Sequence, residues 1–153
     1  MDDTDVASDL LALARSPDNP CFVCSHTNPV GLRVQFDLHD SSIHAEWIPG
    51  KEHQGWQGVV HGGVLAALMD EAMAYTLFTR GCMGMTGRME VRYRSPAHAG
   101  ESLSIKARCV RETKKIADIE AEISASGRPV AAASARFVKV GTIDPDSLFR
   151  PAP

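Results

Sequence analysis

Apolar and polar residues alternate in five segments of the chain, which is the pattern of strands with one buried face. A sixth segment, residues 129–140, has no clear period at its start but becomes strand-like toward its end. Only Asp40, Ser41 and Ser42 separate the first two strands, so we expect a hairpin there. Short turns separate the last four strands. The predicted strands span residues 32–39, 43–48, 89–93, 103–109, 117–125 and 129–140.

One long helix is predicted between the hairpin and the last four strands. Residues 62–80 are apolar on nearly every side, and Gly81 follows them as a helix stop. A helix of this kind is usually central and buried. A single such helix among antiparallel strands predicts an α+β fold rather than a parallel α/β sheet. A short amphipathic helix over residues 3–15 and a proline-rich loop over residues 17–31 precede the hairpin.

The length and composition favour one folded domain. The chain has 153 residues, and 44% of them are hydrophobic, which is enough to form a core. We expect an N-terminal helix and linker in residues 1–20, the main domain in residues 21–141 and a loose tail in residues 142–153. The net charge of −3 favours neither nucleic acid nor an anionic membrane surface as a partner. The longest apolar run, residues 64–69, is far too short to cross a membrane.

A carboxylate lies in the middle of the predicted buried helix. Burying Asp70 there without a partner costs several kcal/mol on the usual scale, so its presence needs an explanation. A structural ion pair with an arginine is one explanation, and a catalytic role is the other. Glu71 beside it needs less explanation, because glutamate is a good helix former. The i±3 and i±4 neighbours of Asp70 are Ala66, Ala67, Met73 and Ala74.

The helix begins with the sequence His61-Gly62-Gly63. Glycines at a helix start either make a turn or let another group approach the backbone. The free N–H groups there can bind a negative oxygen. Together with a carboxylate base, they provide what acyl transfer requires. His61 and Asp70 are half a turn out of phase and about 13 Å apart along one helix, so they can meet only if two helices pack across a dimer axis.

The segment GVVHGGVLAALMDEA resembles the signature of hotdog-fold acyl-coenzyme A thioesterases, especially the phenylacetic-acid-pathway type. The segments CFVCSHTNPVGL and HQGWQGVVHGG resemble a bacterial branch of that group. The resemblance covers about residues 21–140. It implies a hotdog fold, in which a five- to six-stranded antiparallel sheet wraps a long central helix and dimers join their sheets. It also implies an acyl-CoA substrate, with no separate cofactor, and a homodimer or homotetramer with shared active sites.

The same resemblance implies roles for individual residues. Asp70 matches the catalytic carboxylate, which acts as general base on water or as nucleophile. The backbone N–H of Gly63 matches the oxyanion donor, and His61 matches the loop histidine beside it. Thr86 matches a hydroxyl that helps to position the water. In this arrangement Asp70 faces the partner subunit's His61 and the partner subunit's Gly63.

Two further groups of residues follow from the resemblance. The family places an asparagine six residues before the histidine, where this chain has Gly55. Gln54 beside it either supplies the missing amide or is an ordinary polar loop residue. Arg92, Arg94 and Lys115 resemble positions that contact the nucleotide end of coenzyme A, and arginine suits phosphate well. Their alternative role is that of solvated charges on the surface of the sheet.

The cysteines predict neither a metal site nor a disulfide framework. Cys21-x-x-Cys24 with His26 is only half of a zinc site, and no second pair with suitable spacing follows, so we interpret it as a structural loop. The chain begins with acidic residues instead of the pattern of a signal peptide. We therefore expect a cytoplasmic protein with free thiols.

The sequence thus favours an acyl-CoA thioesterase that hydrolyses a small or medium acyl or aryl thioester by Asp-assisted attack of water. The main alternative is a non-catalytic module that binds or senses acyl-CoA on the same fold. Asp70 favours the enzyme, because a binding module has no need of an internal base. A hydratase is disfavoured, because its acid–histidine pair is matched only by Asp40 and His44, with the wrong spacing and in a turn.

Overall fold

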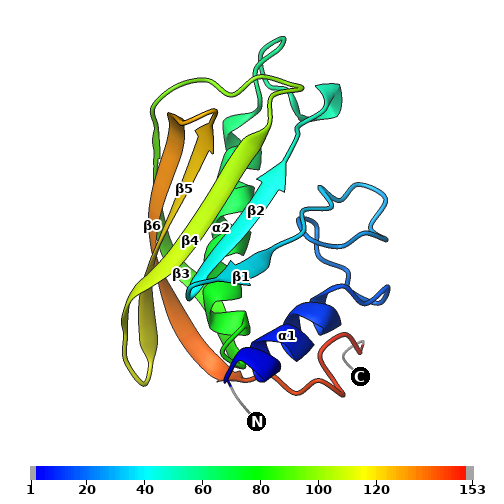
Figure 1. Cartoon of the computed structure of the whole chain (residues 1–153), viewed down its shortest axis with the longest axis vertical. Coiled ribbons are helices and arrows are strands. Elements are labelled where there is room, and N and C mark those ends of the chain that lie inside the picture. The colour runs from blue at the N-terminus through cyan, green and yellow to red at the C-terminus, as the bar shows by residue number, and fades with distance from the viewer. Residues whose placement is uncertain (1–2, 151–153) are drawn as a thin grey trace.

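The structure of the chain is a computed structural model that describes residues 3–150. The first two residues of the predicted N-terminal segment and the last three of the predicted tail lie outside this range. The elements, in chain order, are α1 (Asp3–Ala14), β1 (Asp37–His39), β2 (Ser42–Trp47), a short 3₁₀ helix (Lys51–His53), α2 (Gly62–Phe78), β3 (Cys82–Tyr93), β4 (Leu103–Glu112), β5 (Ile116–Ala125) and β6 (Arg128–Thr142) (Figure 1).

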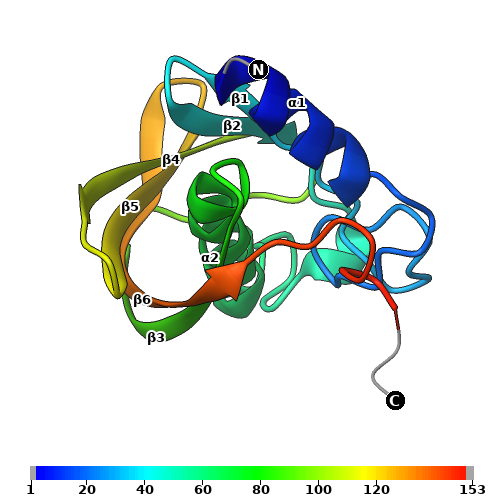
Figure 2. The ribbon, with the colours of Figure 1, turned by 90° about the horizontal axis from the view of Figure 1, so that it is seen from below.

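Six antiparallel strands form one sheet in the order β1-β2-β4-β5-β6-β3. The sheet curves around α2, which Figure 2 shows end-on in the hollow of the sheet. This arrangement confirms the predicted α+β fold with a central helix and an antiparallel sheet. Strands β1 and β3 occupy the two edges, so one edge of the twelve-residue β3 has no partner strand within the described chain.

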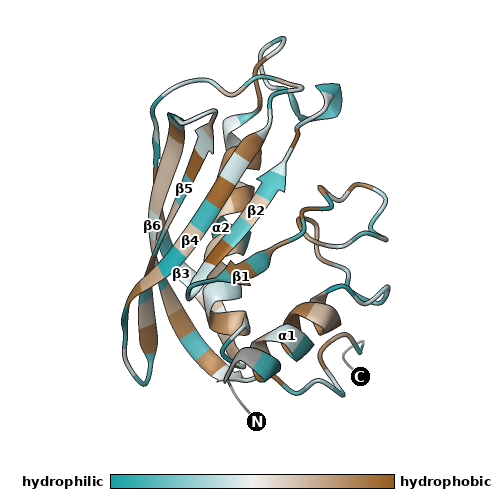
Figure 3. Cartoon of the chain, viewed as in Figure 1, coloured by the Kyte–Doolittle hydropathy of each residue, from teal (hydrophilic) through white to brown (hydrophobic). Residues whose placement is uncertain are grey.

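The core lies between α2 and the inner face of the sheet. Alanines alternate with isoleucines along the inner face of β5, whereas Ala131, Ala133 and Ala135 precede Phe137 on the inner face of β6. These small side chains let α2 pack closely. Figure 3 shows apolar residues alternating with polar ones as bands of brown and teal along β4.

The residues of α2 buried in this core include Leu65, Leu68, Met69, Ala72, Met73 and Leu77. They lie on one side of α2, while Ala67, Asp70 and Ala74 on the other side are half-buried. The prediction of a central helix is confirmed, but the helix is not fully buried on every side.

The prediction of a strand over residues 32–39 is correct only for its last three residues. Leu32, Val34 and Phe36 are buried as the alternation predicts. Residues 32–36 nevertheless pair with the loop before them: the N–H of Leu32 donates to the carbonyl of Phe22, and that of Val34 to the carbonyl of Val23. Only residues 37–39 pair with β2. The buried face was therefore predicted correctly, and its hydrogen-bond partner was not.

Strand β3 is longer than predicted, because it begins at Cys82 rather than Met89. It follows directly on the turn at Gly81, whose φ of 71° fits the predicted helix stop. A bulge between Thr86 and Arg88 shifts the register with β6. Because the bulge inserts one residue, Thr86 before it and Tyr93 after it both point toward α2.

Helix α1 matches the predicted N-terminal helix and buries Ala7, Leu10 and Ala14. Neither α1 nor α2 is long and apolar enough to span a bilayer. Between α1 and β1, a loop runs beside the middle of α2 and brings Cys21 into contact with Glu71 (Figure 1).

Candidate functional site

Asp70 lies at the middle of α2, on the side that faces β3. Its side chain is half-buried, and Thr86 Oγ1 donates a hydrogen bond of 2.7 Å to Asp70 Oδ1. No arginine, lysine or histidine among residues 3–150 lies within 4.0 Å of its carboxylate. A structural ion pair within the described chain therefore does not explain this acid. Its one hydrogen-bond partner within the described chain is Thr86, whose hydroxyl the resemblance implies helps to position the water.

The start of α2 is open to solvent and carries the predicted histidine and glycines. His61 is the N-cap residue, and its Nδ1 accepts a 2.8 Å hydrogen bond from the N–H of Gly63. Tyr93 Oη donates to the carbonyl of Gly62 at 2.8 Å. A Cβ at Gly62 would lie 3.3 Å from the Tyr93 ring, so the ring would have to shift slightly to make room for a side chain there. The N–H of Gly63 thus lies at an exposed helix start, with His61 as its present acceptor.

A single chain does not bring the two halves of the predicted site together. His61 and Gly63 lie at the N-terminal end of α2, about 13 Å and about 10 Å along the axis from Asp70. A hollow of about 330 Å³ lies on the outer face of the sheet. It is lined by Glu90, Arg92 and Lys106 among others, and includes neither Asp70 nor His61.

Gln54 lies in the loop before α2. The nitrogen and the oxygen of its side-chain amide both form hydrogen bonds with the backbone of that loop. Its Nε2 donates to the carbonyl of Lys51 at 2.7 Å, and its Oε1 accepts from the N–H of Gly58. Gly55 packs against His61, since a side chain at Gly55 would come within 3.3 Å of His61 Cδ2. Gln54 therefore helps to shape the loop that holds His61, and this role agrees with the interpretation as a polar loop residue.

The three basic residues predicted to contact the nucleotide lie at different ends of the sheet. Arg92 and Arg94 flank Tyr93 and so lie near the start of α2. Both are exposed, and Arg92 is 3.4 Å from Glu90. Lys115 lies in the turn between β4 and β5, at the other end of β3. Within one chain, Lys115 is not part of the cluster around the helix start.

Of the two acids on α2, Glu71 lies in the more unusual environment, contrary to the expectation that it needs less explanation than Asp70. Cys21 Sγ lies 3.0 Å from Glu71 Oε1. Burial raises the pKa of the Glu71 carboxyl to about 8, and the neighbouring Cys21 adds to the rise. The Cys24 side chain hydrogen-bonds to Cys21 and lowers the pKa of the Cys21 thiol to about 5. The sequence signal for this group of residues was the Cys-x-x-Cys motif. Nothing in the sequence identified Glu71 as its neighbour.

The two tryptophans have opposite environments. Trp47 is 8% exposed and donates from Nε1 to the carbonyl of Leu32 at 2.9 Å, so it is a core residue. Trp56 is 85% exposed, in the loop that leads to His61. Of the two, only Trp56 is placed to contact a molecule that approaches the helix start from solvent.

Comparison with known proteins shows a resemblance to one family. The model of the thioesterase superfamily matches residues 57–132, from the loop before α2 into β6. Human acyl-coenzyme A thioesterase 13 is 33% identical over 85 residues, which cover 53% of this chain. The chain spans 61% of the length of that relative.

Solved structures share the fold. A hypothetical thioesterase from Streptococcus pneumoniae, with coenzyme A, is similar with a TM-score of 0.69 at 20% identity, over 72% of this chain and 88% of that chain. The Escherichia coli PaaI protein from the phenylacetic acid degradation operon is similar with a TM-score of 0.69 at 21% identity, over 74% and 84% of the two chains. Over residues 57–132 the chain therefore resembles the thioesterase superfamily, and its sheet wrapped around α2 is the hotdog fold.

Proposed function

We propose that the protein is an acyl-CoA thioesterase that hydrolyses a small or medium acyl or aryl thioester, with Asp70 as its catalytic carboxylate. The observation that carries the proposal is the pairing of Asp70 with Thr86. Burying an acid in an apolar helix lowers the stability of the fold, so the presence of one there favours a functional role. This one is oriented by a neutral hydroxyl instead of being neutralised by a cation.

The orientation of Asp70 suits proton abstraction from water. Oδ1 accepts the hydrogen bond from Thr86, and no donor to Oδ2 is found among residues 3–150. Oδ2 is therefore available to accept a proton from water, or to attack the thioester directly. Because a thioester is already activated, a placed general base worth about 10²- to 10⁴-fold is sufficient.

The N–H of Gly63 is the proposed donor to the developing oxyanion. It lies at the helix start, where the helix dipole favours negative charge. One such donor is worth roughly 3–4 kcal/mol in the transition state. His61 Nδ1 is its acceptor in this structure, so the thioester oxygen would replace the imidazole, and rotation of His61 about its side-chain bonds would allow this.

The proposed enzyme is a homodimer with shared active sites. Strand β3 has a free edge and carries Thr86 at its middle. A long free edge is a template for pairing with another strand. Pairing of β3 with its copy across a two-fold axis would bring a second α2 alongside the first. The helix start of one subunit would then face Asp70 of the other, as the separation of the two halves along α2 requires.

The decisive experiment is a hydrolysis screen with a panel of short, long and aryl acyl-CoA esters. Release of free coenzyme A is measured for the wild type, for Asp70→Asn and for Asp37→Asn, a control at an exposed acid. We expect at least one ester to be hydrolysed by the wild type and by the control. We expect kcat to fall at least about 100-fold in Asp70→Asn. Full activity of a folded Asp70→Asn protein would exclude Asp70 as the catalytic group.

A non-catalytic acyl-CoA-binding module is the second candidate. The observation that favours it is the hydrogen bond from the N–H of Gly63 to His61, which occupies the proposed oxyanion donor. This candidate predicts micromolar binding of acyl-CoA esters without release of coenzyme A from any of them. The same screen therefore separates the two candidates.

A further inference from the structure

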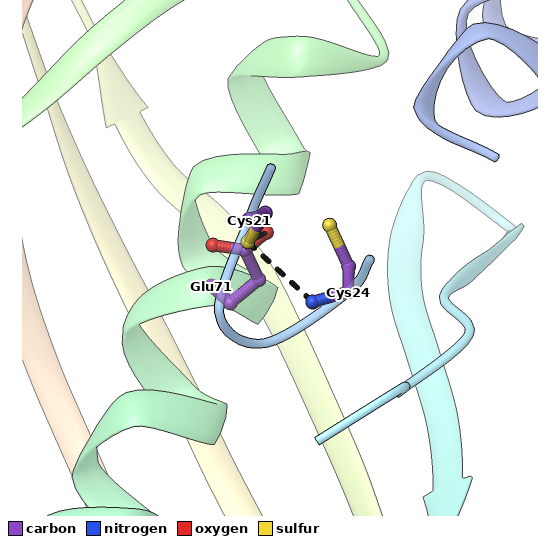
Figure 4. Close-up of side chains that lie close together, drawn as sticks. All are labelled: Cys21, Cys24 and Glu71. Carbon is purple, nitrogen blue, oxygen red and sulfur yellow. Dashed lines mark hydrogen bonds between the residues drawn. The ribbon is translucent and has the colours of Figure 1, made fainter. Parts of the chain in front are cut away.

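Two cysteines of the loop before β1 and one glutamate of α2 converge beside the helix. Cys21 Sγ, Cys24 Sγ and one carboxylate oxygen of Glu71 all lie within 4.8 Å of one another. Cys21 Sγ and Glu71 Oε1 are 3.0 Å apart. All three side chains are half-buried. Figure 4 shows the two sulfurs and the carboxylate gathered on one side of α2.

N–H groups from the surrounding loop donate to both sulfurs. The N–H groups of Val23 and Cys24 donate to Cys21 Sγ at 3.3 and 3.4 Å. Asn19 Nδ2 donates to Cys24 Sγ at 3.3 Å. Asn19 is itself 3% exposed and held by the carbonyl of Ala14. A thiol is a weak acceptor, whereas a thiolate is a good one, so these donors favour ionised sulfurs.

All three side chains can carry negative charge, and they lie close together in a half-buried site. Two thiolates and a carboxylate are stable together only if a cation compensates their charge. The donor set has the softness that zinc prefers.

We propose that Cys21, Cys24 and Glu71 bind one Zn²⁺ ion. Around a tetrahedral zinc, ligand atoms lie about 3.5–3.8 Å apart. The cluster needs only a small opening between Cys21 and Glu71 to reach this spacing. Three protein ligands leave one coordination position for a water molecule. The C-x₂-C half-site of the loop thus gains its third ligand from α2, fifty positions further along the chain.

The proposed ion would fasten the loop to the middle of α2. Glu71 follows Asp70 directly, so the ion would restrict the helix turn that carries the proposed catalytic carboxylate. The site is nevertheless separate from Asp70 and Thr86, and the proposal does not depend on thioesterase activity.

The test uses the full chain, reduced and freed of metal with a chelator, with Zn²⁺ and Co²⁺ as probes. Titration calorimetry should give one Zn²⁺ per chain. Co²⁺ should produce the thiolate-to-cobalt charge-transfer absorption of a site with two sulfur ligands. With zinc bound, alkylation should modify Cys82 and Cys109 and leave Cys21 and Cys24 protected, as read by peptide mass mapping.

Variants identify the ligands. Cys21→Ser and Cys24→Ser should weaken zinc binding at least about 100-fold, and Glu71→Gln at least about tenfold. Cys82→Ser and Cys109→Ser are matched controls, since both are half-buried free cysteines of the sheet, and should bind as the wild type does. Glutamine keeps the size and helix propensity of glutamate, so Glu71→Gln tests the site even if the cysteine variants fail to fold.

Several results would overturn the proposal. These are the absence of the cobalt charge-transfer absorption in the reduced protein, unchanged zinc binding in Cys21→Ser or Glu71→Gln, and equal protection of all four cysteines. A Cys21–Cys24 disulfide that forms readily, with no zinc uptake by the reduced protein, would also overturn it and would assign the pair a redox role instead.

Discussion

Thr86, on the edge strand β3, donates a 2.7 Å hydrogen bond to Asp70, on the central helix α2. The bond joins the proposed catalytic carboxylate to a strand whose other edge is free. A second copy of the chain that pairs with β3 would therefore lie beside this bond. The same residue positions the acid and belongs to the proposed dimer interface.

We predict that removing the Thr86 hydroxyl slows hydrolysis without unfolding the protein. Thr86→Val keeps the shape of the side chain and removes the donor, so kcat should fall about 10- to 150-fold, the equivalent of one hydrogen bond to a charged group. Thr86→Ser keeps the donor and should retain most of the activity. The measurement is kcat on the best ester of the panel, with circular dichroism as the check on folding. Equal kcat values for Thr86→Val and Thr86→Ser would show that the Thr86 hydroxyl does not contribute to hydrolysis.

Shared active sites predict complementation between two inactive variants. Asp70→Asn and Gly63→Pro are each expected to lose activity, because the first removes the carboxylate and the second removes the proposed oxyanion N–H in the first turn of α2, where proline is tolerated. When the two are mixed and allowed to exchange subunits, one site of each heterodimer is intact, so about a quarter of wild-type activity should return. A mixture of Asp70→Asn with Asp70→Ala is the control and should stay inactive. Sedimentation of the active wild type as a monomer would contradict the proposed dimer.

Close packing of β3 on α2 predicts that Gly84 does not tolerate a side chain. A Cβ at Gly84 would lie 2.5 Å from Leu77 Cδ1, and Leu77 is fully buried. Gly84→Ala should therefore lower the free energy of unfolding by about 1–3 kcal/mol, as overpacked cores do. Gly141→Ala, where nothing lies within 4 Å, is the control. Urea denaturation measures both, and equal stability of the two variants would show that Leu77 moves aside freely.

An ion-pair cluster at the end of α2 predicts a pH-dependent contribution to stability. Lys139 donates to Glu112 at 2.7 Å and lowers the pKa of its carboxyl, and Arg80 contributes to the same effect. A carboxyl whose pKa is lower in the folded state stabilises the protein above its unfolded pKa. This contribution is lost as the pH falls through the folded value.

Glu112→Gln should therefore reduce the free energy of unfolding at pH 7 by about 1 kcal/mol or less, because the pairs are partly exposed to solvent. The difference from the wild type should vanish at acidic pH, where Glu112 is protonated in both states. Glu122→Gln, at an exposed position of β5, should show no comparable trend. A difference that persists at low pH would assign the effect to packing instead of charge.

Local periodicity was enough to predict the central helix and most of the sheet. The apolar residues of α2 lie on all its sides, and the alternation in β4 and β5 specifies one buried face. In β3 the signal failed over its first half. Gly84 and Gly87 carry no side chain, and the bulge at Gly87 breaks the period of two.

Partners that are distant in the sequence could not be predicted from periodicity. Residues 32–36 have the burial of a strand, but their hydrogen bonds go to a loop that no local pattern identifies as a partner. The contact between Cys21 and Glu71 joins positions fifty residues apart, and only the fold brings them together. The contact of Asp70 with Thr86 was not predicted either, since the family resemblance implied only that the Thr86 hydroxyl helps to position the water.

Only residues 79–81 join the last residue of α2 to the first residue of β3. Because the connection is so short, the orientation of α2 about its axis determines which residues of β3 face the helix. Because successive strand residues point to opposite faces, one inserted residue would turn Thr86 outward and leave Asp70 facing a different side chain. We therefore expect the site to be more sensitive to an inserted residue at this junction than to a substitution of Thr79 or Arg80. Attempts to widen the substrate range by loop grafting should therefore avoid this junction and use the longer loop before α2.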